Sequence, residues 1–334
     1  MPQGMSSTQG VKHMQYIHGI RMATCGLVLA LLTACAPKSY TVRHPAPSDI
    51  VFGNPPAAAP LTLVDARPDG ERVFSSGILP AELMVDGTAL GPAAYLARNL
   101  QAELTARGVP AQVTLGGDAT PTLTLRTFRV QNHRANGFSP FVTLTFLSGD
   151  LATPSGPQRL GVFVKRGKVP VWSFEEVIEP TFNQPLSLAT KELAAKIASR
   201  LYDARSSDAE VDRLATKIAT RGDDSYLDVY ALGFTNNPKA IDVLATLAGD
   251  ADEYVRLAAI SSLGTLGATG KLDLLKSIYR EGGLWQDRAM ALKAIGDLDA
   301  AEADAFMAEQ QAALQARAGD KEADWTLQII RLYQ

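Results

Sequence analysis

The residue with the clearest chemistry is a cysteine at the end of an apolar run near the N-terminus. The run closes on Leu32-Thr33-Ala34-Cys35, residues 22–36 carry no charge, and Lys12 and Arg21 precede them. A basic start, a short apolar centre and small residues before a cleavage point make up a secretory signal. The run is too short for a transmembrane helix, which needs about 20 apolar residues. We therefore expect cleavage near Cys35 and chemistry at its thiol.

The four-residue motif resembles the lipobox of bacterial lipoproteins. The resemblance implies that residues 1–34 are removed, and that Cys35 carries diacylglycerol on its sulfur and a third acyl chain, such as palmitate, on its amine. Two or more chains give a stable membrane anchor. Ala36 stands where many inner-membrane lipoproteins of Gram-negative bacteria have aspartate. We therefore expect a lipid-anchored, periplasm-facing protein of the outer membrane.

Two alternatives concern the same segment. An ordinary signal would be cut after Ala36, but Pro37 would then follow the scissile bond, which signal peptidases tolerate poorly. The true start also stays open between Met1, Met14 and Met22. A start at Met14 gives a more usual signal length.

Composition excludes several functional classes. The chain has 32 basic and 35 acidic residues, and without Lys12 and Arg21 the net charge is −5. Mild acidity argues against nucleic acid, which requires a concentrated basic face. The only cysteines, Cys25 and Cys35, lie in or next to the signal, so no disulfide or thiolate metal site is expected in the mature chain.

No catalytic constellation stands out in the sequence. After the signal there are two histidines, His44 in a proline-rich stretch and His133 in a polar segment that we expect to be a surface turn. No Gly-x-Ser-x-Gly motif, zinc-ligand spacing or phosphate loop accompanies them. We expect no catalytic residue, no metal and no cofactor; an envelope hydrolase is a minor alternative.

Asp65 and Arg67 are a polar pair at the end of a short apolar strand. One interpretation is a binding site for a small anion or peptide at the strand terminus. The interpretation we favour is a turn-stabilising aspartate paired with the neighbouring arginine.

Element patterns divide the mature chain into three parts. Residues 35–60 are rich in proline and alanine and are typical of an extended, lipidated tether. Residues 61–205 predict an α+β domain, with a mixed or antiparallel sheet covered on one face by two helices. The expected helices cover 92–107 and 185–201, and the expected strands 61–64, 111–115, 122–130, 141–148, 159–166 and 171–179.

Several of these features together resemble the YajG-type family of bacterial lipoproteins. The matching features are the lipobox, the segment 63–68 (Leu-Val-Asp-Ala-Arg-Pro), the helix that ends at Arg107-Gly108, the strand 122–125 and a closing helix that ends at Asp203. The resemblance covers roughly residues 25–205. It implies an envelope lipoprotein and no specific mechanism.

Residues 206–334 are helical and contain a repeat. Arg256 recurs as Arg288 and Gly264 as Gly296, each 32 residues on, and Leu232-Gly233 stands 31 residues before Leu263-Gly264. The Val-Arg-x-x-Ala-x-x-x-Leu-Gly pattern resembles HEAT-like repeats, which stack into a solenoid. We expect an all-α solenoid with helices at 210–220 and 322–333 as its caps.

Residues of the repeat are the best candidates for binding. Tyr226, Tyr230, Tyr254 and Trp285 fall on or at the start of first helices, and such aromatic residues often anchor interfaces; they could equally fill the core. We expect Arg256 and Arg288 to bridge neighbouring units, through Asp252 or Asp287, with a ligand-binding ladder as the alternative.

These features favour a non-catalytic, protein-binding scaffold of the cell envelope, with its partners on the helical repeats. The alternative is a carrier or sensor of a small ligand, a lipid or a glycan, held by the first domain. Whether the two domains pack together or are hinged at residues 205–208 stays open from the sequence.

Overall fold

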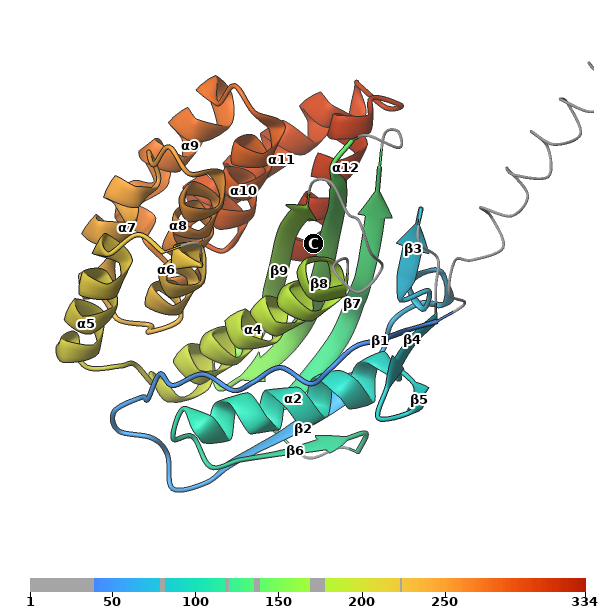
Figure 1. The fold of residues 1–334 in the computed structure, drawn as a ribbon, viewed down its shortest axis with the longest axis vertical. Helices are drawn as coiled ribbons and strands as arrows, with labels where there is room; N and C mark the ends of the chain where they lie inside the picture. Colours follow the sequence, from blue (N-terminus) through green and yellow to red (C-terminus); the bar gives the residue numbers. More distant parts are fainter. Residues whose placement is uncertain (1–38, 79–81, 118–119, 135–138, 169–177, 223) are drawn as a thin grey trace, which may run out of the picture. The chain divides into compact units, whose positions relative to one another are not determined.

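The computed structural model describes residues 39–334, except 79–81, 118–119, 135–138, 169–177 and 223. The chain divides into residues 1–40 and a second compact unit, residues 41–334. The expected signal and Cys35 lie outside the described residues. In the second unit an α+β region precedes a run of helices, as predicted (Figure 1).

A mixed sheet forms the centre of the α+β region. Its strands are β2 (Ala59–Asp65), β3 (Ser75–Gly77), β6 (Ala111–Leu115), β7 (Thr122–His133), β8 (Phe141–Thr153) and β9 (Gly156–Lys168). They lie in the order β6-β2-β7-β8-β9, and β3 pairs with the last part of β7. The pairs of β2 with β6 and β7 are parallel, whereas β7, β8 and β9 form an antiparallel meander.

Two long helices cover one face of this sheet, as predicted. They are α2 (Pro92–Ala106) and α4 (Gln184–Tyr202). The apolar residues of β7, such as Leu125 and Phe128, are buried on this face. The strand expected at 171–179 falls largely outside the described residues. Its last residue is helical instead, because the π-helical turn η2 (Glu179–Asn183) leads directly into α4.

The expected tether is largely part of the folded body. After β1 (Ser39–Thr41), the chain runs along α2, with Val42, Ile50 and Phe52 buried. The Phe52 amide donates to the Arg107 carbonyl over 2.8 Å, and the Ser48 amide donates to Glu103. The prediction of an extended tether over residues 35–60 is therefore wrong from Val42 onward, because its few apolar side chains pack on the domain.

A small hairpin lies beside the start of this segment. It consists of β4 (Glu82–Val85) and β5 (Thr88–Ala89), paired through Met84 with Ala89. The Val42 amide donates to the Met84 carbonyl over 2.8 Å. The hairpin therefore fixes the point at which the chain enters the body.

Residues 206–334 form helical hairpins in two rows. The helices are α5 (Asp208–Ala219), α6 (Ser225–Gly233), α7 (Ile241–Leu247), α8 (Glu253–Thr265), α9 (Leu272–Glu281), α10 (Trp285–Gly296), α11 (Ala301–Gln315) and α12 (Lys321–Ile330), followed by the turn η5 (Arg331–Tyr333). Helices α6, α8 and α10 pack against one another as an inner row, with α7, α9 and α11 outside them.

The recurring glycine has a steric reason. A Cβ atom on Gly233 would lie 2.2 Å from Ser262 Oγ, and one on Gly264 would lie 2.5 Å from the Cα of Ala294. Successive inner helices therefore approach so closely that no side chain fits between them. The Leu-Gly signature marks these contacts.

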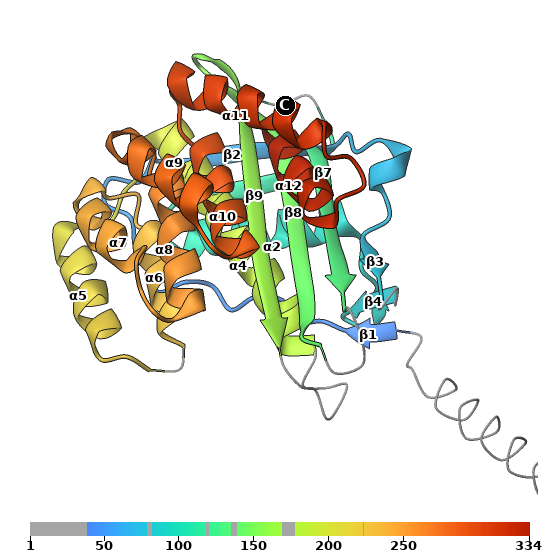
Figure 2. The ribbon, with the colours of Figure 1, turned by 90° about the horizontal axis from the view of Figure 1, so that it is seen from above.

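The helical repeats pack onto the α+β region instead of hinging from it. The turn η5 contacts β8 and β9, and Arg129 of β7 donates to Gln328 of α12, so the second face of the sheet is covered (Figure 2). Backbone hydrogen bonds also hold the segment that connects the two regions. The Gly53 amide donates to the Arg205 carbonyl and the Ser206 amide donates to the Thr235 carbonyl, each over 2.8 Å.

Candidate functional site

Asp65 and Arg67 pair with each other. Arg67 Nε and Nη2 donate to the two carboxylate oxygens of Asp65, each over 2.8 Å, and Nη1 donates to the Phe128 carbonyl. The hydrogen bonds from Arg67 lower the pKa of Asp65 below its usual value. The Arg67 guanidinium is buried and its donors are engaged. This geometry is that of the turn-stabilising pair and leaves little for an anion.

Tyr226 and Tyr254 lie against the α+β region. Their rings flank the buried guanidinium of Arg166 on β9, at 4.4 and 4.1 Å from ring centroid to Cζ. Arg166 Nη2 donates to Gln184 Oε1 over 2.7 Å and to the Tyr226 hydroxyl over 3.0 Å. Burial raises the pKa of Tyr226 to about 12. Cation–π contacts of a desolvated arginine join the two regions here.

The Tyr254 hydroxyl also closes the outer edge of β9. It donates to the Gly167 carbonyl over 2.6 Å and accepts from the Gly167 amide over 3.2 Å. Unpaired backbone groups of an edge strand are a template for pairing with another chain. At Gly167, the helical repeats satisfy these groups within the molecule.

Tyr230 and Trp285 are also buried. Tyr230 stacks on Phe234. Trp285 Nε1 donates to Thr326 Oγ1 over 2.9 Å, and its ring lies 5.1 Å from that of Trp325. Three of the four aromatic candidates are therefore buried inside the molecule, and the half-buried Tyr254 is held against β9.

Arg256 and Arg288 each bridge to the next helical unit, which is the structural role that we favoured over a ligand-binding ladder. Arg256 Nε donates to Asp287 over 3.0 Å, and Arg288 Nη2 donates to Glu322 over 3.1 Å. Each guanidinium also donates to the carbonyl six residues earlier, in Asp250 and in Gly282.

The other carboxylate considered for the ladder has a different role. Asp252 accepts from the Tyr254 and Val255 amides, over 2.8 and 3.0 Å. It is therefore the N-cap of α8, where a carboxylate satisfies free helix amides.

A buried cluster of four charges is the feature that sequence reasoning missed. Glu192 and Lys196 come from α4, and Lys293 and Asp297 from the end of α10. Glu192 lies 2.7 Å from Lys196 and 2.5 Å from Lys293, whereas Asp297 lies 2.6 Å from Lys196 and 2.7 Å from Lys293. The Tyr333 hydroxyl donates to Asp297 over 2.8 Å. The two cations and two anions compensate one another.

The pKa shifts of Lys293 and Asp297 within the cluster favour their charged forms. Burial disfavours the charged forms, but Lys196 and Lys293 outweigh it and hold the pKa of Asp297 below its usual value. The carboxylates likewise raise the pKa of Lys293. Lys196 also donates to the Gly161 carbonyl of β9 over 2.5 Å. The cluster therefore joins α4, α10 and the sheet.

The two histidines after the signal have structural contacts. His44 stacks on Tyr95 and lies 2.9 Å from Asn99 Oδ1. His133, at the end of β7, packs edge-on against Trp325 beside Lys321, and burial together with that cation lowers the pKa of His133. His133 thus contacts α12 rather than standing in a free turn. The described part of the chain contains no group of three metal-ligating side chains.

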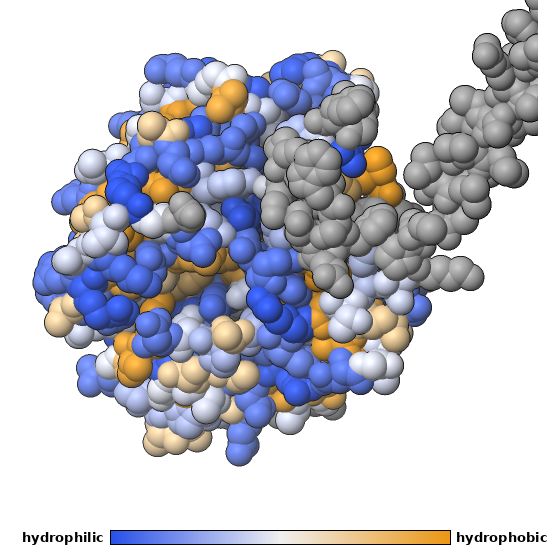
Figure 3. All heavy atoms as spheres, in the orientation of Figure 1, coloured by the Kyte–Doolittle hydropathy of each residue, from blue (hydrophilic) through white to orange (hydrophobic). Residues whose placement is uncertain are grey.

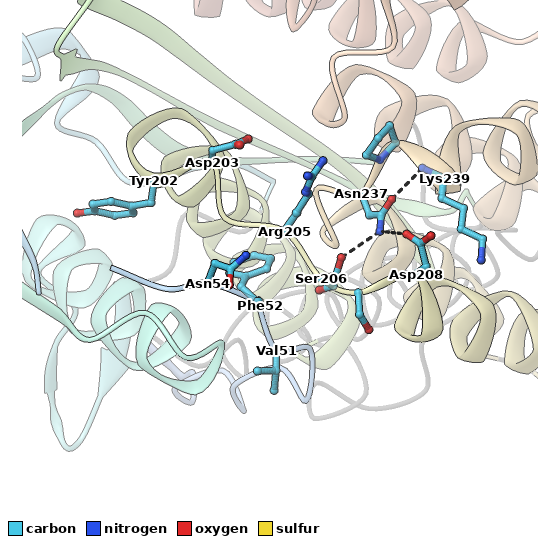
Figure 4. Close-up of a pocket in the computed structure, with 13 residues that line it drawn as sticks. Val51, Phe52, Asn54, Tyr202, Asp203, Arg205, Ser206, Asp208, Asn237 and Lys239 are labelled. Carbon is cyan, nitrogen blue, oxygen red and sulfur yellow. Dashed lines mark hydrogen bonds between the residues drawn. The ribbon is translucent and has the colours of Figure 1, made fainter. Parts of the chain in front are cut away.

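A pocket of about 890 Å³ lies where the two regions meet (Figure 4). Asn237 Nδ2 donates to the Ser206 carbonyl and to Asp208, and Asn237 Oδ1 accepts from the Lys239 amide. The buried Ser206 hydroxyl has no hydrogen-bond partner among the described residues. Phe52 adds an apolar wall. The lining is mainly polar, which suits a small polar ligand better than a lipid.

The outer surface is largely hydrophilic on the face shown in Figure 3, with small scattered apolar patches. Among the residues that the structure describes, no helix has the length and apolar character to cross a bilayer.

Comparison with known proteins identifies one feature of the chain. Residues 229–296 match the family model of HEAT repeats. This span covers α7, α8, α9 and α10 and the second half of α6, and it confirms the prediction of HEAT-like repeats. No curated protein and no solved structure matches the chain.

Proposed function

We propose that the protein is a lipid-anchored lipoprotein of the bacterial envelope, periplasm-facing on the outer membrane, which acts as a non-catalytic scaffold for protein partners. The motif around Cys35 supports the anchor, and the resemblance of residues 25–205 to the YajG-type family supports the envelope setting. HEAT repeats generally provide extended interaction surfaces, which supports a scaffold.

The observation that carries the proposal is the orientation of the repeats. Aromatic and charged residues of the inner helices contact the sheet and α4 of the same molecule. Tyr254 bonds to Gly167 of β9, and Lys293 pairs with Glu192 of α4. The outer helices α7, α9 and α11 face away from that contact (Figure 1). Partners would therefore bind the outer row, not the residues first considered.

Site-specific photocrosslinking tests this assignment. A photoreactive amino acid replaces exposed Asp273 of α9 or Glu309 of α11 in the full-length protein, with exposed Gln112 of β6 as the matched control. We expect discrete crosslinked proteins from positions 273 and 309 in intact cells and none from position 112. Crosslinks from Gln112 alone would contradict the proposal.

The polar pocket favours a second candidate, a carrier or sensor of a small ligand. Its volume falls in the range of ligand sites, about 300–1,000 Å³, and the Ser206 hydroxyl in its lining has no partner among the described residues. Of the two ligand classes considered, the lining favours a glycan. Native mass spectrometry of the 37–334 fragment would then show a bound ligand that Ser206→Ala and Asn237→Ala lose.

A further inference from the structure

We infer that the end of the body formed by β3, β4 and β5 lies against the phospholipid surface. The inference rests on the proposed acylation of Cys35 and adds to it the side of the molecule that faces the membrane. The partner is the lipid headgroup layer itself.

The first argument is the length of chain available. Val42 is buried and bonded to Met84, so the chain is fixed to the body from that residue. Six residues, 36–41, separate it from Cys35. The seven residue steps from Cys35 to Val42 span at most about 25 Å when fully extended. A free tether as far as residue 60 would have reached about 85 Å. The fixed segment therefore holds an acylated protein close to its membrane.

The second argument is which end the chain enters. The bond from Val42 to Met84 places the entry beside β4. Figures 1 and 2 both show β3 next to β4. The short tether must therefore bring this end, and not the helical repeats, to the lipid surface.

The third argument is the side chains found there. Val73 and Ile78 flank β3 and are 62% and 51% exposed, which is unusual among the large apolar residues of the described chain. Ile78 is held by a bond from its amide to the Asn132 carbonyl. Single exposed apolar side chains are common on protein surfaces, so it is their position beside the entry of the chain that makes Val73 and Ile78 candidates for lipid contact. At a bilayer, such side chains enter the boundary between headgroups and acyl chains.

The charges at this end do not favour a purely electrostatic attachment. The exposed arginines are each paired with a carboxylate: Arg43 with Glu179, Arg72 with Asp69 and Arg98 with Asp86. Among the residues that the structure describes at this end, no unbalanced basic patch stands out to attract anionic lipid. The contact should therefore depend on the anchor and the apolar side chains, and should persist at high salt.

The orientation agrees with the proposed scaffold. In Figures 1 and 2, the outer helices α7 and α9 lie on the opposite side of the body from β3 and β4. Lipid contact at β3 would leave these outer helices clear of the membrane and open to the periplasm.

Depth-dependent fluorescence quenching tests the inference. Val73→Cys and Ile78→Cys are made singly in the acylated full-length protein and labelled with a nitrobenzoxadiazole fluorophore; the sulfur of Cys35 is blocked by its lipid. Val51→Cys is the matched apolar control, because Val51 is 58% exposed and lies near Gly108, at the other end of α2. Asp242→Cys on α7 is the control on the outer helices.

The labelled proteins are reconstituted in vesicles of phosphatidylethanolamine and phosphatidylglycerol that contain a spin-labelled lipid. We expect strong quenching at positions 73 and 78 and only solvent background at 51 and 242, unchanged at high salt. Equal quenching at all four positions in an acylated, vesicle-bound protein would overturn the inference and leave the anchor intact. Absence of the acyl mass would overturn both.

Discussion

Lys196 of α4 and Asp297 at the end of α10 form a buried ion pair with 2.6 Å between nitrogen and oxygen. The pair joins two residues 101 positions apart in the chain. Because Lys293 and Glu192 complete it on both sides, the α+β region and the helical repeats share one charged core. We therefore expect the two regions to unfold together.

Replacing Asp297 with asparagine tests this shared core. Removing one partner of a buried ion pair costs about 3–5 kcal/mol, because the remaining charge is left uncompensated. We expect Asp297→Asn to lower the free energy of unfolding by this order, in one cooperative urea transition. Asp212→Asn, which breaks an exposed pair with Lys239, is the control and should change stability by under about 0.5 kcal/mol. Two separate transitions in the wild type would argue against a joint core.

The lowered pKa of Asp297 predicts how the free energy of unfolding changes at acidic pH. Its folded-state pKa lies below the usual value of about 3.9. The stability that Asp297 contributes is therefore fully present above that usual value and is lost as the pH falls through the lower folded-state pKa. In urea titrations between pH 3 and 7, the wild type should lose stability at the acid end. Asp297→Asn should show a shallower loss, and parallel curves would contradict the assignment.

Gly264→Ala tests the close approach of the inner helices. In an ordinary helix interior this change would stabilise by up to about 1 kcal/mol. Here the new Cβ would lie 2.5 Å from the backbone of Ala294, so we expect a loss of about 1–3 kcal/mol from overpacking. Gly270→Ala, where the Cβ meets open space, is the control. Thermal unfolding measures the change in stability. An increase in stability for Gly264→Ala would show that the two helices can move apart to accept the new methyl group.

Tyr254→Phe tests the closure of the β9 edge. The change keeps the ring against Arg166 but removes the hydroxyl that bonds the Gly167 carbonyl and amide. We expect a loss of about 1 kcal/mol in the free energy of unfolding, because partly buried backbone groups lose their hydrogen-bond partner. Hydrogen exchange at the Gly167 amide should rise more than elsewhere in β9. Tyr279→Phe, on the outer helix α9, serves as the control for the loss of a tyrosine hydroxyl.

Cys35→Ala tests the anchor directly. Without the thiol no thioether to diacylglycerol can form, so the variant should lack the acyl mass and keep its signal. Intact mass spectrometry and membrane fractionation of both proteins measure this. An unmodified, correctly cut wild type would instead indicate an ordinary secreted protein.

The sequence predicts those parts of the fold whose signals are local. The spacing of Leu96, Leu100 and Leu104 predicts α2, and the recurring glycine predicts the inner helices because close helix contacts require it. Asp65 with Arg67, and Arg256 with Asp287, are likewise predictable, since the first pair lies within one turn and the second joins neighbouring copies of the repeat.

The contacts between the two regions could not be predicted in this way. Glu192 and Lys196 stand four residues apart, which is typical of an exposed helical pair, and nothing local reveals that Lys293 and Asp297 cover them. The tyrosines were candidates for a surface because their partner, Arg166, lies 60 or more residues away. Single residues such as Phe52 in a proline-rich stretch give too weak a pattern to predict burial.

The cover on the second face of the sheet has a consequence for the order of assembly. The strands β7 to β9 end by residue 168, but α12 and η5, which pack on them, comprise residues 321–333. Since the chain leaves the ribosome N-terminus first, one face of the sheet stays uncovered until some 150 further residues have been synthesised. The sheet can therefore complete its packing only after residues 321–333 have been synthesised.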